Sequence, residues 1–176
     1  MEKRLLELER ALKGMSSDEI ERWSTQEGIQ DQELVRLLDA RSRPVGDEVA
    51  LLLVKKTRPE LVASALLGRQ LHRALGRVRA TWVLHQFGKK FEQASKAYLA
   101  LLDDPSIDVL SNALFGLVFM GKKEALEAIR MAAEGSSGKR KELLERAKEA
   151  LEKGDPKLFS PFFADSANVW GLRTEK

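Results

Sequence analysis

Few side chains in this sequence combine the types and spacings that perform chemistry. Its two histidines, His72 and His85, stand on different expected helices, and neither has a carboxylate at metal-ligand spacing. An imidazole can act as a general base or a metal ligand near neutral pH. The helical pattern, however, places His72 on an apolar stripe and His85 beside Trp82. We therefore expect two packed histidines and no catalytic one.

Two further clusters resemble catalytic motifs. Asp103 and Asp104 are adjacent carboxylates of the kind used in acid and base catalysis, but they precede Pro105, where an aspartate caps a helix. Ser136-Ser-Gly-Lys139 matches the Ser-x-x-Lys of penicillin-binding enzymes, yet the companion motifs Ser-Asp-Asn and Lys-Thr-Gly are missing. We interpret the first cluster as a cap and the second as a linker that ends in a helix cap. The sequence thus predicts no catalytic residue, no metal and no cofactor.

Composition narrows the classes of chemistry further. The 176 residues include no cysteine, which excludes thiol nucleophiles, thiolate zinc sites and disulfides, and fits a reducing compartment. The chain starts Met-Glu-Lys-Arg, and no apolar run approaches the roughly 20 residues that span a bilayer. We expect a soluble cytoplasmic protein without membrane association.

Charge is distributed unevenly along the chain. Residues 1–40 carry six basic and ten acidic side chains, residues 41–96 carry twelve and four, and residues 97–176 carry twelve and thirteen. The central block therefore has a net charge of +8 within a chain whose total is +3. Such a block either attracts an anionic partner such as nucleic acid or forms a solvated face that keeps the protein soluble.

The middle of the sequence repeats itself with a shift of 33 residues. Ala80, Trp82, Leu84 and Phe87 align with Ala113, Phe115, Leu117 and Met120, and Gly88, Gly121 and Gly154 are equally spaced. A period of this size is typical of stacked helical hairpins, each of which buries its apolar face only against its neighbours.

Apolar spacing and capping signals predict helices throughout the chain. The expected ranges are 2–13, a short helix after Ser16 that holds Ile20 and Trp23, 31 to about 42, 47–56, 57–75, 77–87, 91–102, 109–120, 124–133, 139–153 and a short helix from 155. Ser16 with Glu19, and Thr57 with Glu60, have the spacing of capping boxes. Gly68, inside the expected helix 57–75, predicts a close helix crossing, and the 109–120 helix is apolar on nearly every side, as expected for a fully buried helix.

The segment Asp103-Asp104-Pro105 followed by Val109, Ala113, Gly116-Leu117 and Gly121 resembles a HEAT repeat, particularly the short bacterial kind of the phycobilisome lyases. Two positions depart from the family pattern, since Leu110 replaces an arginine and Gly76 replaces a valine. The resemblance implies an all-α, right-handed α-α superhelix, a short solenoid of about four to five hairpins. We expect an N-terminal helical cap at 1–30, repeats at 31–164 and a tail at 165–176. No catalytic residue transfers with this resemblance.

Our leading hypothesis is therefore a non-enzymatic protein-binding module of the scaffold, adaptor or inhibitor type. The second helices of such repeats line a concave surface, and the predicted surface here is centred on Gln93, Lys96, Glu127 and Arg130. The alternative is nucleic-acid binding through the basic segment 41–96, in which a row of cations runs along successive helices. The row consists of Arg69, Arg73, Arg77, Lys89, Lys90 and Lys96, and it is extended by Lys122, Lys123 and Arg130 if the repeats keep their register. An enzyme of unfamiliar mechanism is a third possibility.

Overall fold

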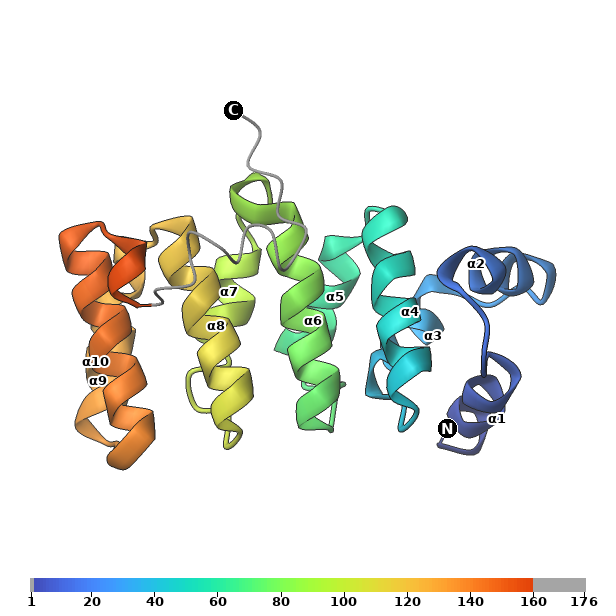
Figure 1. Ribbon diagram of the computed structural model, residues 1–176, viewed down its shortest axis with the longest axis horizontal. Coiled ribbons are helices and arrows are strands. Elements are labelled where there is room, and N and C mark those ends of the chain that lie inside the picture. The colour runs from blue at the N-terminus through green and yellow to red at the C-terminus, as the bar shows by residue number, and fades with distance from the viewer. Residues whose placement is uncertain (1, 160–176) are drawn as a thin grey trace. The chain divides into compact units, whose positions relative to one another are not determined.

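The computed structural model describes residues 2–159, and every regular element within that range is a helix (Figure 1). The α-helices are α1 (Glu2–Ala11), α2 (Ser17–Gln26), α3 (Asp31–Arg36), α4 (Arg43–Lys55), α5 (Pro59–Leu67), α6 (Ala74–Phe87), α7 (Ala94–Leu99), α8 (Ile107–Met120), α9 (Leu126–Glu134) and α10 (Gly138–Lys153). Short 3-10 helices are η1 (Leu37–Asp39), η2 (Gly88–Lys90), η3 (Lys123–Ala125) and η4 (Pro156–Leu158). The predicted all-α class is confirmed for this part of the chain.

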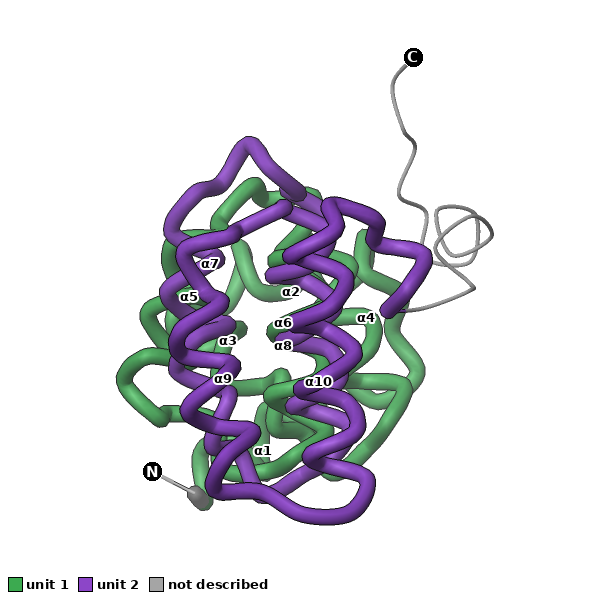
Figure 2. Tube along the Cα trace, turned by 90° about the vertical axis from the view of Figure 1, so that its left-hand side faces the viewer, with its two compact units in different colours: residues 1–84 green, residues 85–176 purple. Residues whose placement is uncertain are grey.

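The chain forms two compact units, residues 1–84 and residues 85–176 (Figure 2). In the first unit α3 packs against both α4 and α5, and α2 packs against α4. In the second unit α7 packs against α8, while α10 packs against both α8 and α9. Figure 2 shows α7 and α9 on one side of the second unit and α8 and α10 on the other. The second unit is thus built of two helical layers.

The 33-residue period reappears in the places where helices end. Helices α6, α8 and α10 end at Phe87, Met120 and Lys153, so their last residues are 33 positions apart. The glycines that follow have positive φ angles of 52°, 64° and 66° at Gly88, Gly121 and Gly154. A residue with a side chain avoids this left-handed conformation, which glycine adopts readily. The three glycines therefore hold equivalent positions, as the sequence repeat predicts.

Helix α8 is the core of the second unit, but it is not buried on every side as expected, because Asp108 is exposed and Phe115 and Phe119 are half-buried. Five of its apolar side chains are fully shielded from solvent, namely Val109, Leu110, Ala113, Leu114 and Leu117. Its start is fixed by Ser106, whose hydroxyl accepts a hydrogen bond from the Val109 amide. Asp104 accepts from the Ser106 amide at 2.9 Å and so supports the turn before α8, but the N-cap is Ser106 and not an aspartate as expected.

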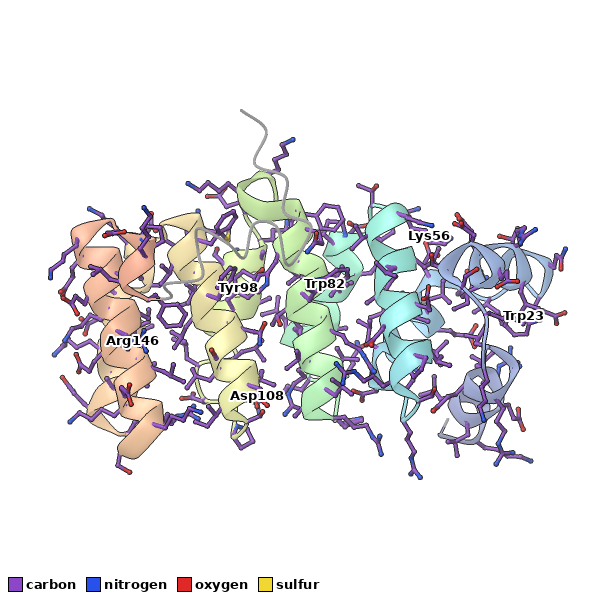
Figure 3. The ribbon with its side chains drawn as sticks, viewed as in Figure 1. Trp23, Lys56, Trp82, Tyr98, Asp108 and Arg146 are labelled. Atoms are coloured by element: carbon purple, nitrogen blue, oxygen red, sulfur yellow. The ribbon has the colours of Figure 1, made fainter. Side chains whose placement is uncertain are left out.

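A glycine lets the Tyr98 ring lie against the backbone of α8. Figure 3 shows Tyr98, a residue of α7, next to α8, and its side chain is almost completely buried. A Cβ atom at Gly116 would stand 2.4 Å from one ring carbon of Tyr98 and 2.6 Å from another. Both distances are shorter than any tolerated contact, so a larger residue requires the two helices to separate.

We expect Gly116→Ala to lower the free energy of unfolding by about 1–3 kcal/mol, because the added methyl overpacks a closed interface. Chemical denaturation measures this change. Gly135→Ala is the matched control, because Gly135 lies in the same unit, has nothing within 4 Å of the added atom and has a φ of −83°. If the two variants lose equal stability, the contact with Tyr98 is not the cause.

Several expected helix ends are wrong. The Ser16–Glu19 capping box is present, but Thr57 has a φ of 54° and Arg58 holds the N-cap position of α5 instead. The expected helix 57–75 is two helices, because α5 ends at Leu67 and α6 begins at Ala74. Gly68 is the C-terminal cap of α5 and not a helix crossing.

Helix lengths also differ from expectation. Helix α4 begins at Arg43, four residues before the expected start, with Pro44 in its first turn, where a missing amide does no harm. Helix α7 covers only Ala94–Leu99 of the expected range 91–102. The C-terminal aromatic residues Phe162, Phe163 and Trp170 lie outside the described residues.

A buried arginine joins the helices of the first unit. The guanidinium of Arg79, on α6, donates to the carbonyl oxygens of Leu38 at 2.8 Å, Ala40 at 3.2 Å and Arg43 at 3.0 Å. Its Nε atom also lies 2.8 Å from the Asp47 carboxylate. The Arg79 side chain is only 5% exposed. These bonds tie the turn between η1 and α4 to α6 and provide donors to its buried carbonyls.

The second unit has a comparable arginine. Arg140, in the first turn of α10, donates to the Asp104 carbonyl at 2.6 Å and to the carbonyl of Leu102. The turn that leads into α8 is therefore tied to α10 by a charged side chain.

Candidate binding surface

The two histidines have opposite environments. His72, predicted to be inward, is exposed, because it lies in the connection between α5 and α6 and not on a helix. His85 is buried as expected, but its ring packs against Tyr98 at 5.4 Å and Phe115 at 5.1 Å between ring centroids. Its Nε2 atom hydrogen-bonds the Asn112 carbonyl at 3.1 Å. Burial lowers the pKa of His85 to about 4, against the opposing effect of that bond.

The serine cluster has local structural contacts. The Ser136 hydroxyl donates to the Ala132 carbonyl at 2.7 Å, and Ser137 stands at the N-cap position of α10. This agrees with a linker that ends in a helix cap. Across residues 2–159 no three His, Cys, Asp or Glu side chains are grouped so that they could hold a metal ion.

The four residues at the centre of the predicted surface are all exposed. Gln93 immediately precedes α7, Lys96 lies on α7, and Glu127 and Arg130 lie on α9. The guanidinium of Arg130 contacts the Glu127 carboxylate at 2.7 Å and the Glu134 carboxylate at 2.8 Å. These contacts raise the pKa of Arg130, and the Arg130 bond lowers the pKa of Glu127. Arg130 is thus committed to its own helix, a pairing that the i,i+3 and i,i+4 spacing of Glu127, Arg130 and Glu134 could have indicated.

The structure brings three of the predicted residues together in one groove. Gln93, Lys96 and Lys122 line a groove of about 320 Å³ between α7 and the start of η3, in which Leu99 is half-buried and Leu117 is fully shielded from solvent. Lys122 lies 3.0 Å from Glu92 across this groove. This contact is the main cause that holds the pKa of Glu92 below its usual range, and the charge of Lys96 makes a smaller contribution. Glu127 and Arg130 do not line the groove.

The predicted row of cations falls partly in each unit. In the first unit Arg69 and Arg73 are exposed, whereas Arg77 donates to the carbonyls of Leu71 and His72. Arg77 therefore stabilises the connection before α6 instead of extending freely into solvent. In the second unit the exposed lysines of the row, apart from Lys96, are Lys89, Lys90 and Lys123.

The charge asymmetry of the sequence is largely balanced within the folded units. Lys55 contacts Asp18, while Lys56 and Arg58 both contact Asp31, at 3.0 and 3.4 Å. Cations of the basic block thus pair with acids from the acidic first forty residues. Residues 1–84 contain 15 basic and 13 acidic side chains, and residues 85–176 contain 15 and 14. Each unit is therefore close to neutral, with net charges of +2 and +1.

The sequence analysis did not predict the exposure of one residue and the burial of another. Met131, on α9, is 63% exposed and lines a shallow depression with Asp103 and Arg140. Arg79, counted among the cations of the basic block, is buried. No local pattern distinguishes either residue from its neighbours, since their environments are created by segments far away in the sequence.

No family model, curated protein or solved structure matches this chain. Within the described residues, no helix combines the length and the apolar character that crossing a membrane requires.

Proposed function

We propose that this chain is a short, right-handed HEAT-like solenoid of about four to five hairpins that binds a protein partner and performs no catalysis. The groove between α7 and η3, defined by Gln93, Lys96, Leu99, Leu117 and Lys122, is its binding surface. A scaffold, adaptor or inhibitor works in this way.

The sequence separation between hydrogen-bonded residues on different segments supports this architecture. The Ser17 amide donates to Glu48, the Ser42 amide to Glu9, and Arg140 to the Asp104 carbonyl, across 31, 33 and 36 residues. These separations are close to one 33-residue repeat. Contacts between neighbouring repeats are the interactions that stabilise a solenoid.

The observation that carries the function is the composition of the groove. The half-buried apolar side chain of Leu99 lies beside side chains of both charges, Glu92, Lys96 and Lys122. Non-obligate protein interfaces combine an apolar centre with a polar rim in this way. A groove of mixed charge is poorly suited to a polyanion, because carboxylates repel phosphates.

The nucleic-acid alternative has less support. The near-neutral charge of each unit and the pairing of Lys55, Lys56 and Arg58 with acids reduce the field that would attract phosphates. If nucleic acid were the partner, affinity would fall steeply with salt, with a slope near −0.9 per phosphate contact on duplex DNA.

Affinity capture from host lysate, with and without nuclease, tests the proposal. We expect one stoichiometric protein that survives nuclease treatment, and we expect Lys96→Glu to reduce its recovery severalfold with little change in melting temperature, because Lys96 is exposed. Lys141→Glu is the matched control, since Lys141 is also exposed, belongs to the same unit and lies outside the groove. Loss of all bound material after nuclease treatment, or equal recovery with both variants, contradicts the proposal.

A further inference from the structure

The short helix that lines one side of the groove is held in place by one large side chain. Helix α7 has six residues, of which Ala94, Ala97 and Tyr98 are buried. Two of these are alanines, so Tyr98 provides most of the apolar surface that α7 itself buries. Lys96 and Leu99, which line the groove, lie within two residues of Tyr98 on the same helix. The position of these groove residues therefore depends on how the Tyr98 ring is packed.

His85 lies against that ring and against α8. Its imidazole centroid is 5.4 Å from the centroid of the Tyr98 ring and 5.1 Å from that of Phe115 on α8. Its Nε2 atom hydrogen-bonds the Asn112 carbonyl of α8 at 3.1 Å. The Tyr98 ring also lies directly against the α8 backbone at Gly116. His85 thus contacts both helices at the place where they meet, and it touches the side chain that anchors α7.

The surroundings of His85 disfavour a charge on its ring. From α7 it is faced by Tyr98, whose pKa is raised by burial, so that this phenol stays neutral. The charged residues one helical turn away are Lys89, four residues after His85, and Asp108, four residues before Asn112, and both are exposed. Burial lowers the pKa of His85 to about 4, while the Asn112 bond acts in the opposite direction. A proton on this imidazole is therefore costly as long as the ring stays buried.

We propose that His85 makes the groove acid-sensitive, because protonation of its ring releases α7 from α8 and opens the groove. Separation of the two helices admits water to the imidazole, so the open form binds a proton more readily than the closed form. Only a six-residue helix has to move, so this opening exposes less apolar surface than unfolding of the whole unit. Release of a partner in acid rests on the proposed function, whereas the opening of α7 does not.

Native-state hydrogen exchange on the full chain, at several urea concentrations below the unfolding transition, tests the opening. The reporters are the amides of Ala100 and Leu101 at the end of α7, which donate to the carbonyls of Lys96 at 3.1 Å and Tyr98 at 3.0 Å. We expect both amides to exchange through an opening that depends less steeply on urea than the opening at the buried Ala147 of α10, because less surface is exposed.

The same measurement at pH 7.5 and 5.0 tests the role of His85. After correction for intrinsic exchange rates, the opening constant of α7 should rise about thirtyfold, because the pKa of His85 falls from 6.5 when the ring is hydrated to about 4 when it is buried. His85→Gln keeps a donor for the Asn112 carbonyl but cannot be protonated, so its opening constant should change little. His72→Gln is the matched control and should retain the full change, since His72 is exposed.

Equal urea dependence at α7 and α10 would overturn the proposal, as would an equal pH response in the parent protein and His85→Gln. If His85→Gln does not fold, an opening constant of the parent protein that is the same at both pH values also overturns it. Lys96→Glu should reduce capture of the partner and leave the opening of α7 unchanged. Failure to capture any protein at pH 7.5 would contradict the proposed function and not the opening of α7.

Discussion

Replacing Arg79 with methionine is expected to lower the free energy of unfolding by about 3–5 kcal/mol, the range observed when a buried charged network loses one partner. The guanidinium supplies four donor contacts, to the carbonyls of Leu38, Ala40 and Arg43 and to the Asp47 carboxylate. Methionine has similar length but no donor, so the three carbonyls lose the guanidinium bonds and the Asp47 carboxylate loses its buried partner. For a chain of this size we expect the melting temperature to fall by roughly 6–20 °C.

Arg43→Met is the matched control for this prediction. Arg43 also contacts Asp47, at 3.6 Å, but its side chain is 81% exposed. An exposed ion pair contributes little to stability, so this variant should remain within about 0.5–1 kcal/mol of the parent. Equal losses in Arg43→Met and Arg79→Met would show that the shared carboxylate, and not the buried turn, dominates.

Gly46 provides a second, independent check. A Cβ atom there would stand 2.1 Å from the Arg79 guanidinium, so Gly46→Ala should destabilise the parent protein. In the Arg79→Met background the guanidinium is gone, and alanine is the better helix former. We therefore expect the cost of Gly46→Ala to fall sharply in the double variant. Additive costs in a double-mutant cycle would contradict the packing described for this turn.

These effects illustrate what the sequence could and could not predict. The helical class and the helix ends before Gly88, Gly121 and Gly154 could be predicted. Apolar periodicity and a glycine that adopts a positive φ are both local signals. The role of Arg79 could not, because its partners lie 32 to 41 residues away. In the sequence it is one cation among twelve in the basic block.

The break between α5 and α6 shows the same limit at the level of secondary structure. Leu71 is buried although it lies in the connection, so the apolar stripe of the expected helix 57–75 continues through a region that is not helical. The break depends on Arg69, at a φ of 51°, and on Asp39, which binds the amides of His72 and Arg73. The exposed position of His72 follows from this break. Neither the positive φ of Arg69 nor the hydrogen bonds of Asp39 can be recognised from the local sequence.

The candidate groove was predictable only in part. Helical spacing predicts that Gln93 and Lys96 face outward, and the repeat alignment adds Lys122 to the row of cations; the structure places all three in one groove. Arg130 was assigned in the same way, but Glu127 and Glu134 bind its guanidinium. The i,i+3 and i,i+4 spacing of these three residues on α9 favours such pairs, so outward position alone was not sufficient to identify a side chain available to a partner.

Acidification is expected to destabilise the second unit through His85. Because burial lowers the pKa of His85 from 6.5 to about 4, the unfolded chain binds a proton between these values that the folded chain does not. The contribution of neutral His85 is therefore present above pH 6.5 and is lost as the pH falls toward 4. Over the whole window this loss is about 3 kcal/mol, and between pH 7.5 and pH 5 it is about 2 kcal/mol.

Urea unfolding at pH 7.5, 6.5, 5.5 and 5.0 measures this dependence above the range in which most carboxylates titrate. His85→Gln keeps a donor for the Asn112 carbonyl but cannot be protonated, so its stability should be nearly independent of pH in this window. His72→Gln is the control, and because the His72 side chain is exposed it should retain the slope of the parent protein. A parent protein whose stability is flat from pH 7.5 to 5, or a slope that persists in His85→Gln, would mean that His85 is charged or hydrated in the folded state.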